Sequence, residues 1–161
     1  FEVGLQGYTG KFVVYKGDAA SIKKEFTDER LGFTAVMFPQ PFGMTAEYNV
    51  GKGPRYNPAA NAVGLGHLEG GYVLFSYAVK AKQQSIMPFV RFQYYDGGKK
   101  HESDGRSYTV YETEFGVEWQ PVPSFELTAA YNIADRTYID VAKPINNQHG
   151  SFLRLQAQVN F

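Results

Sequence analysis

Apolar and polar residues alternate along most of this chain with a period of two. The pattern is clearest near the C-terminus. There, every second residue from Leu153 to Phe161 is apolar, and the residues between them are Arg, Gln or Asn. Successive side chains of a β-strand point to opposite faces of its sheet. This segment therefore predicts a strand with one apolar face and one polar face.

The same alternation recurs in the preceding segments, less cleanly toward the N-terminus. Together they predict about eight strands, at 2–16, 30–38, 42–50, 72–80, 85–95, 109–119, 125–133 and 151–161. Pro88 falls inside one of these segments, where it cannot donate a ladder hydrogen bond, so we expect it near a turn or at a bulge. The predicted fold class is all-β, an antiparallel sheet that forms a single domain over residues 1–161.

The connections between these segments alternate between short and long. Short turns are predicted at 38–41, 81–84 and 121–124, and longer polar segments at 17–24, 51–70, 96–107 and 134–150. Short periplasmic turns opposite long extracellular loops are typical of outer-membrane β-barrels. The connections therefore favour that architecture.

If the chain crosses a membrane, it must do so as a closed barrel of strands. No stretch approaches the about 20 consecutive apolar residues that a spanning helix needs. A closed antiparallel barrel satisfies its backbone hydrogen bonds between strands, and it has no free edge in the lipid. Aromatic residues make up 16% of the chain and glycines number 17, a composition that suits strands joined by turns.

The alternation alone fits a membrane barrel with an apolar outer face or a soluble lipocalin-like barrel with an apolar interior. On the apolar face, aromatic residues concentrate at the strand ends, which favours the membrane barrel because such barrels carry aromatic girdles at both interfaces. Tyr111 and Trp119 are about 20 Å apart along the membrane normal, close to the height of an apolar band. The predicted girdle residues are Phe42, Tyr48, Tyr94, Tyr111, Trp119, Phe125, Tyr131 and Phe161.

The polar face carries the charged residues and would line the interior of the barrel. Basic residues there could favour anions, while acidic residues could favour cations or form salt bridges that stiffen the wall. Acidic residues outnumber basic ones on this face, which argues against strong phosphate selectivity. The predicted pore-lining residues are Arg30, Glu47, Lys80, Arg91, Glu112, Glu114, Glu118 and Arg154.

No motif predicts an enzyme, a cofactor or a metal site. His67, His101 and His149 all fall in predicted loops, and neither a Gly-x-Ser-x-Gly elbow nor a His-Glu-x-x-His motif occurs. The chain has no cysteine, which excludes disulfides and thiolate metal sites. Basic and acidic residues number 16 each, so the charge balance gives no reason to expect nucleic-acid binding.

Several segments resemble the phosphate-selective porin O/P family, in matching order and over most of residues 38–161. They are FPQPFGMTAEYNVGKGPRYNP at 38–58, FVRFQYYDGGKKHESDGR at 89–106, EFGVEWQPVPSFELTAAYNIADRTY at 114–138 and FLRLQAQVNF at 152–161. The terminal Phe161, in register with the apolar face, also resembles the C-terminal strand that the barrel-assembly machinery recognises in outer-membrane proteins. Location in the bacterial outer membrane is implied.

The resemblance implies a porin, a passive diffusion channel for small hydrophilic solutes or ions, with anions such as phosphate among the candidates. Family members are longer, so we expect the C-terminal half of a sixteen-stranded porin, with an eight-stranded relative as the alternative. Eight strands alone enclose an interior that side chains nearly fill. A small plugged structural or adhesive barrel is therefore the alternative function, and a soluble ligand-binding barrel is a third. The expected partners are the lipid bilayer, lipopolysaccharide, the barrel-assembly machinery and further copies of the chain in a homotrimer.

Overall fold

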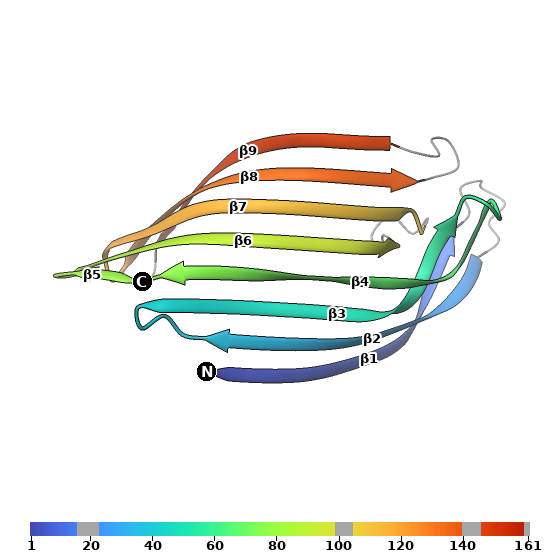
Figure 1. Cartoon of the computed structure of the whole chain (residues 1–161), viewed down its shortest axis with the longest axis horizontal. Coiled ribbons are helices and arrows are strands. Elements are labelled where there is room, and N and C mark those ends of the chain that lie inside the picture. Colours follow the sequence, from blue (N-terminus) through green and yellow to red (C-terminus); the bar gives the residue numbers. More distant parts are fainter. Residues whose placement is uncertain (16–22, 99–104, 140–145, 160–161) are drawn as a thin grey trace.

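The computed structural model describes residues 1–15, 23–98, 105–139 and 146–159. These residues form nine β-strands and no helix, which confirms the all-β prediction (Figure 1). None of the described residues belongs to a helix long and apolar enough to cross a membrane. The strands are β1 (Glu2–Tyr15), β2 (Lys23–Met37), β3 (Phe42–Asn57), β4 (Ala62–Tyr77), β5 (Val79–Ala81), β6 (Gln84–Gly98), β7 (Ser107–Val122), β8 (Phe125–Ile139) and β9 (Asn146–Val159).

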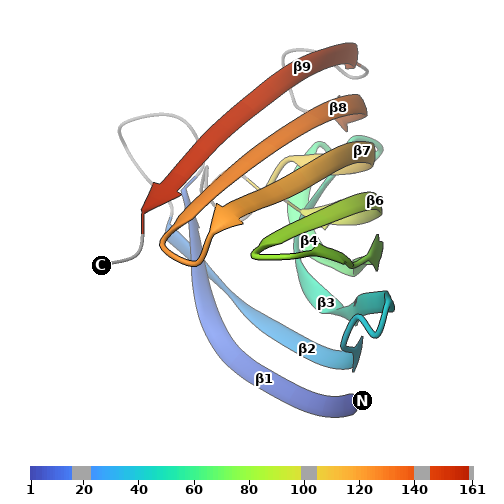
Figure 2. The ribbon, with the colours of Figure 1, turned by 90° about the vertical axis from the view of Figure 1, so that its left-hand side faces the viewer.

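All nine strands belong to one antiparallel sheet. The order is β1-β2-β3-β4-β6-β7-β8-β9, with the short β5 paired to β6, so neighbours in the sheet follow the order of the chain. β1 and β9 form the two edges, and no pairing joins them within the described ranges. Figure 2 shows that the sheet curves strongly between these edges. This curved, open sheet has the form of a section of barrel wall.

The short strand β5 continues the line of β4. The register that pairs Ser76 with Phe89 runs on unchanged to the pair of Val79 with Ile86. At this register Tyr77 and Ala78 lie opposite Pro88 and Met87, and no pairing joins these described residues. The sequence prediction of about eight strands therefore holds, with β4 and β5 counted as one interrupted strand.

Pro88 explains this interruption, because proline has no N–H to donate to the neighbouring strand. On the side facing β3, the amide of Ala78 donates to the carbonyl oxygen of Pro41 at 2.7 Å. On its other side, Pro88 keeps a regular pairing with Val117 of β7. Pro88 therefore lies near a turn, as expected, shortly after the turn at 82–83. The alternative of a bulge was wrong, because a residue without an N–H disrupts the ladder on one side only.

The tight turns lie together at one end of the sheet, as the sequence predicted. They connect β2 to β3 at 38–41, β5 to β6 at 82–83 and β7 to β8 at 123–124. At the first position of the two-residue turn, Lys82 has a φ of 57°, which such hairpin turns favour. The strand ends that flank the segments predicted as loops at 17–24, 96–107 and 134–150 lie at the other end, which we call the long-loop end. The strands extend into each of these segments, and most of what remains between them lies outside the described residues.

The long loop predicted at 51–70 was wrong, because this stretch is a β-hairpin. β3 and β4 pair without interruption through it, as far as Asn57 opposite Ala62. Several of its positions are glycines, including Gly53, which pairs with Gly66. Glycine has no side chain to mark a face of the sheet, so the alternation that identifies the other strands is not visible here.

The connection that remains between β3 and β4 is a compact turn at 58–61. The Oδ1 atom of Asn57 accepts hydrogen bonds from the amides of Ala59 at 3.0 Å and Ala60 at 3.4 Å. Asn61 has a φ of 46°, a conformation that asparagine tolerates better than most residues. Local hydrogen bonds of the two asparagines thus close this hairpin.

The outer part of this hairpin bends away from the line of the sheet (Figure 1) and is fastened to β6 and β7. Arg55 forms a bidentate pair with the carboxylate of Asp96, with N–O distances of 2.5 and 3.0 Å. The Nε atom of Arg55 donates to the hydroxyl of Ser107 at 2.7 Å, and the hydroxyl of Thr109 donates to Asp96 at 2.6 Å. A bidentate arginine–carboxylate pair is directionally specific, so this network fixes the hairpin to its neighbours.

The two faces of the sheet differ in exposure. On the apolar face of β7, Phe115 and Val117 are 51% and 39% exposed. On the polar face of the same strand, Glu114 is 4% exposed. Side chains converge on the concave face of a curved sheet and diverge on its convex face, so the more buried set lies on the concave face. We therefore assign the polar face to the concave side and the apolar face to the convex side.

Candidate functional site

The pairing registers decide which side chains share a face. Glu47 lies opposite Tyr72, and Tyr72 lies opposite Gln93. Glu112 completes this row on β7. Followed across every pair of strands, the registers place all eight predicted pore-lining residues on the same polar face. These are Arg30, Glu47, Lys80, Arg91, Glu112, Glu114, Glu118 and Arg154.

A buried carboxylate on this face is shared by two arginines. Oε2 of Glu114 lies 2.9 Å from Nη2 of Arg91 on β6, and Oε1 lies 3.0 Å from Nη2 of Arg154 on β9. The side chain of Glu114 is 6% exposed, while those of the arginines are 30% and 45% exposed. The three groups together carry one net positive charge. They also connect strands on both sides of β7 across the concave face.

A second ion pair lies at the long-loop end of the same face. Nε and Nη2 of Arg30 donate to the two carboxylate oxygens of Asp28, at 2.9 and 3.2 Å. Asp28 is fully buried, and the sequence analysis did not identify it. The available signal was its position two residues before Arg30, which puts both side chains on one face of a strand. The alternation is weak in β2, because Phe26 shares this face with the two charged residues.

The remaining predicted pore-lining residues are less constrained. Glu47 accepts a hydrogen bond from Nδ2 of Asn49 at 2.6 Å. Lys80 lies in β5, near the tight turns. With the other described residues, neither Lys80 nor the carboxylates of Glu112 and Glu118 form a hydrogen bond or ion pair. These three charges are therefore available to the space that the concave face encloses.

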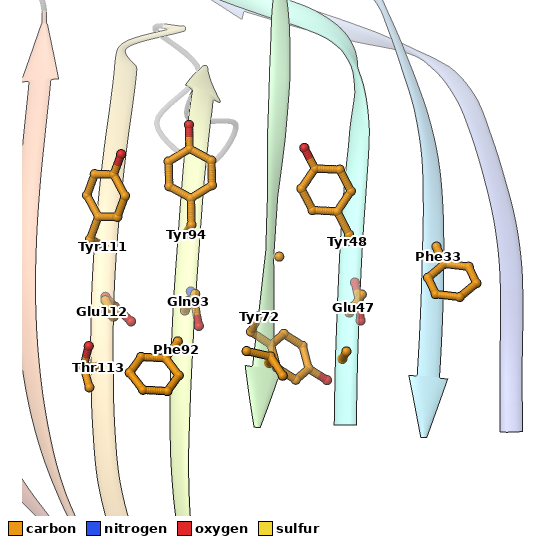
Figure 3. A pocket seen from close by; sticks show the side chains of 13 residues that line it. Phe33, Glu47, Tyr48, Tyr72, Phe92, Gln93, Tyr94, Tyr111, Glu112 and Thr113 are labelled. Atoms are coloured by element: carbon orange, nitrogen blue, oxygen red, sulfur yellow. The ribbon is translucent and has the colours of Figure 1, made fainter. Parts of the chain in front are cut away.

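The apolar face carries a row of tyrosines toward the long-loop end. Tyr48, Tyr94 and Tyr111 lie on the same ladder row of β3, β6 and β7, with Gly71 of β4 between the first two. Figure 3 shows their three hydroxyls pointing the same way along the strands. The hydroxyl of Tyr48 donates to Glu69 at 2.6 Å, and the rings of Tyr94 and Tyr111 are 5.0 Å apart. A mostly apolar hollow of about 460 Å³ opens over Gly71.

Aromatic residues also lie near the tight turns on the apolar face. Phe42 stacks on Phe75, with ring centroids 6.0 Å apart, and Nε1 of Trp119 donates to Oε1 of Gln84 at 3.1 Å. Phe125 is the first residue of β8 and lies on the same face. A side chain with an apolar body and a polar edge, such as Trp119, suits a membrane–water interface. The girdle assignment of these residues remains a prediction.

Two predicted girdle residues stand apart from these groups. Tyr131 shares the apolar face but pairs with Phe115, four positions along β7 from Tyr111. It is therefore not on the ladder row of the other tyrosines. Phe161 lies outside the described residues.

The histidines that the structure describes lie in strands, not in the predicted loops. In β4, Nε2 of His67 is 3.5 Å from Glu69, and in β9, Nδ1 of His149 is 2.6 Å from Asp135. Both histidines are more than half exposed and share the convex face. Among the described residues, no three His, Cys, Asp or Glu side chains form a group that could hold a metal ion. His101 lies outside the described part of the chain.

A curved antiparallel sheet with an apolar convex face, a charged concave face and tight turns at one end is the wall of a transmembrane β-barrel. The class of the protein is therefore that of the outer-membrane barrels. The family model for phosphate-selective porin O and P matches residues 9–161, so the chain belongs to the porin O and P family. This family is one of outer-membrane channels, which points to a channel rather than an enzyme. No curated protein and no solved structure matches the chain significantly.

Proposed function

We propose that this chain forms part of the wall of a passive diffusion channel for small hydrophilic solutes in the bacterial outer membrane. The polarity of the two faces carries the proposal. Leu155 and Phe115 are exposed on the convex face, where lipid would cover them, whereas Glu114 and both of its arginines lie on the concave face. A water-filled interior accommodates these charged side chains, whereas the hydrocarbon of a membrane would not. The eight residues of the concave face named above are the proposed pore lining.

The proposed channel has weak charge selectivity, and phosphate is not its preferred solute. The charge of Arg30 is neutralised by Asp28, and Glu114 offsets one of its two arginines. Acidic side chains such as Glu118 add negative charge to the same face. Rings of charged side chains determine the ion preference of a pore. A wall with this mixture discriminates little between small anions and cations.

The open edges of the sheet support a barrel with additional strands. An unpaired edge exposes a row of N–H and C=O groups, which is very unfavourable in the hydrocarbon of a membrane. β1 and β9 do not pair with each other in the described structure, so we place further strands between them. Barrels of sixteen strands leave an aqueous channel. The proposal also includes three kinds of partner, which rest on the family resemblance alone. They are further copies of the chain in a homotrimer, lipopolysaccharide, and the barrel-assembly machinery, which would recognise the C-terminal strand.

Replacing both Arg91 and Arg154 by Gln should shift the reversal potential of the channel toward cation selectivity. Both guanidiniums face the interior and Glu114 would lose its counter-charges, so the interior field becomes more negative. The measurement is the reversal potential across a planar bilayer under a KCl gradient. The shift should shrink at about 1 M salt, where the Debye length is about 3 Å.

The variant Lys52→Gln is the matched control for this experiment. It also removes positive charge, but Lys52 lies on the opposite face of β3 from Glu47. Its reversal potential should equal that of the unmodified protein. An unchanged potential in the double arginine variant at low salt would show that both arginines only brace the wall. A protein that inserts but never conducts would favour the plugged structural barrel.

A further inference from the structure

A second hollow, of about 430 Å³, opens around Gly70 of β4. Gly70 belongs to the polar face, opposite Asn49 of β3 and Tyr95 of β6. Because glycine has no side chain, a space remains on this face between the side chains of Asn49 and Tyr95. A Cβ atom at Gly70 would lie 2.9 Å from the ring of Tyr95. The concave-face side chains that line the hollow are those of Arg30, Glu47, Asn49, Leu68, Tyr72, Gln93 and Tyr95.

The rings of Tyr72 and Tyr95 form two walls of this hollow. The hydroxyl of Tyr95 donates to the carbonyl oxygen of Gly98 at 2.7 Å, which holds the ring against the strand. The ring of Tyr72 lies toward β3, beside Glu47 (Figure 3). The volume is within the range of small-molecule pockets, which combine apolar or aromatic walls with a few placed polar groups. The hollow therefore has the form of a binding site and not only of a gap in the wall.

The charge of the hollow disfavours an anion. Of the described residues that line it, Arg30 alone is cationic, and its Nε and Nη2 atoms both donate to the buried carboxylate of Asp28. Glu47 adds a negative charge, and among the described residues its one hydrogen-bonding partner is the neutral amide of Asn49. Phosphate would meet a compensated guanidinium and an uncompensated carboxylate. A neutral solute would meet no such repulsion.

Hydrogen-bonding groups are available in the hollow. In the described part of the chain, neither the side-chain amide of Gln93 nor the hydroxyl of Tyr72 has a hydrogen-bonding partner. The amide of Gln93 offers both donors and an acceptor, and the hydroxyl of Tyr72 offers one of each. Glu47 binds Asn49 through Oε1. Its carboxylate therefore presents a further acceptor to the hollow.

We propose that this hollow is a subsite for neutral, hydroxyl-rich solutes, with short oligosaccharides as the chemical class. The rings of Tyr72 and Tyr95 would cover the apolar C–H face of a sugar, and Gln93 and Glu47 would exchange hydrogen bonds with its hydroxyls. The subsite deepens the proposed channel function and rests on the concave face being the channel interior. It also gives the channel a solute preference that differs from phosphate.

The test is the block of ion current by maltotriose in planar bilayers that contain the purified protein. We expect the current to fall in a saturable manner, and inorganic phosphate at equal ionic strength to leave it unchanged. Tyr72→Ala and Gln93→Ala should each raise the half-blocking concentration by about threefold to tenfold, which corresponds to a loss of about 0.7–1.4 kcal/mol of binding free energy. The control Gln156→Ala removes a side-chain amide from the same face, on β9 and away from the hollow.

Equilibrium dialysis of the detergent-solubilised protein with radiolabelled maltotriose measures the same affinities without conduction. Weaker binding in Tyr72→Ala and Gln93→Ala but not in Gln156→Ala is the expected result. Absence of saturable binding, or equal loss in all three variants, would overturn the subsite. A conducting protein that phosphate blocks and maltotriose does not would also overturn it. Saturable binding by a protein that never conducts would instead contradict the proposed channel function.

Discussion

Replacing Leu155 by Arg is expected to destabilise the membrane-inserted protein by about 2–4 kcal/mol if the residue lies near the bilayer midplane. Leu155 is 73% exposed on the convex face of β9, where the proposed fold puts the hydrocarbon of the membrane. A guanidinium there has neither water nor a counter-ion, so its transfer from water is unfavourable. The measurement is urea-induced unfolding of the protein in phospholipid vesicles.

The neighbouring variant Gln156→Arg is the control for this prediction. It introduces the same charge one residue further along the strand, on the concave face, where water and Glu118 are within the same enclosed space. We expect a loss well below 1 kcal/mol, as for an ordinary exposed substitution. Val117→Arg and Glu118→Arg repeat the comparison on β7. A larger loss from Gln156→Arg than from Leu155→Arg would mean that the barrel is apolar inside, as in the soluble alternative.

Removal of the shared carboxylate in Glu114→Ala should lower the free energy of unfolding by about 1–3 kcal/mol. The guanidiniums of Arg91 and Arg154 then face each other without the acceptor that both now contact at about 3 Å. The full penalty for a buried ion pair would be larger, but both arginines are partly exposed, and water stabilises them. The same vesicle-based unfolding assay measures this loss.

Glu112→Ala is the matched control, because it removes a carboxylate from the same strand and face. Glu112 has no ion pair with another described residue, so we expect a change within about 0.5 kcal/mol. Glu114→Ala should also move the reversal potential toward anions, since it leaves two positive charges uncompensated. Equal stability of the two variants would show that the shared carboxylate contributes nothing to the wall.

The sequence predicted the fold most accurately where large side chains mark both faces. Over most of β7, β8 and β9, apolar residues alternate with polar or small ones, so period-two alternation identifies both the strand and its orientation. The same alternation put all eight pore-lining candidates on one face, Lys80 of the short β5 included. Resemblance to the porin O and P family then identified the class, and the family model confirms it.

Other features could not be read from alternation, for reasons that particular residues make clear. The hairpin at 51–70 is rich in glycine, which leaves no mark on either face. Asp28 is buried beside Phe26 on a strand with mixed polarity. Its ion pair with Arg30 depends on how the two side chains are oriented, which the sequence pattern does not give. The hollow around Gly70 combines residues of β2, β3, β4 and β6, and its existence depends on pairing registers that no local pattern contains.

Reactivity of single cysteines along β7 tests most directly the assignment of an outer apolar face and an inner polar face. The chain contains no cysteine, so each substitution from Glu112 to Glu118 introduces a unique thiol. A charged, water-soluble maleimide added to the protein in vesicles should label positions 112 and 118, where the polar face is accessible, and spare 113, 115 and 117. Labelling of the odd positions with protection of 112 and 118 would contradict the account, because the apolar face would then be in contact with water.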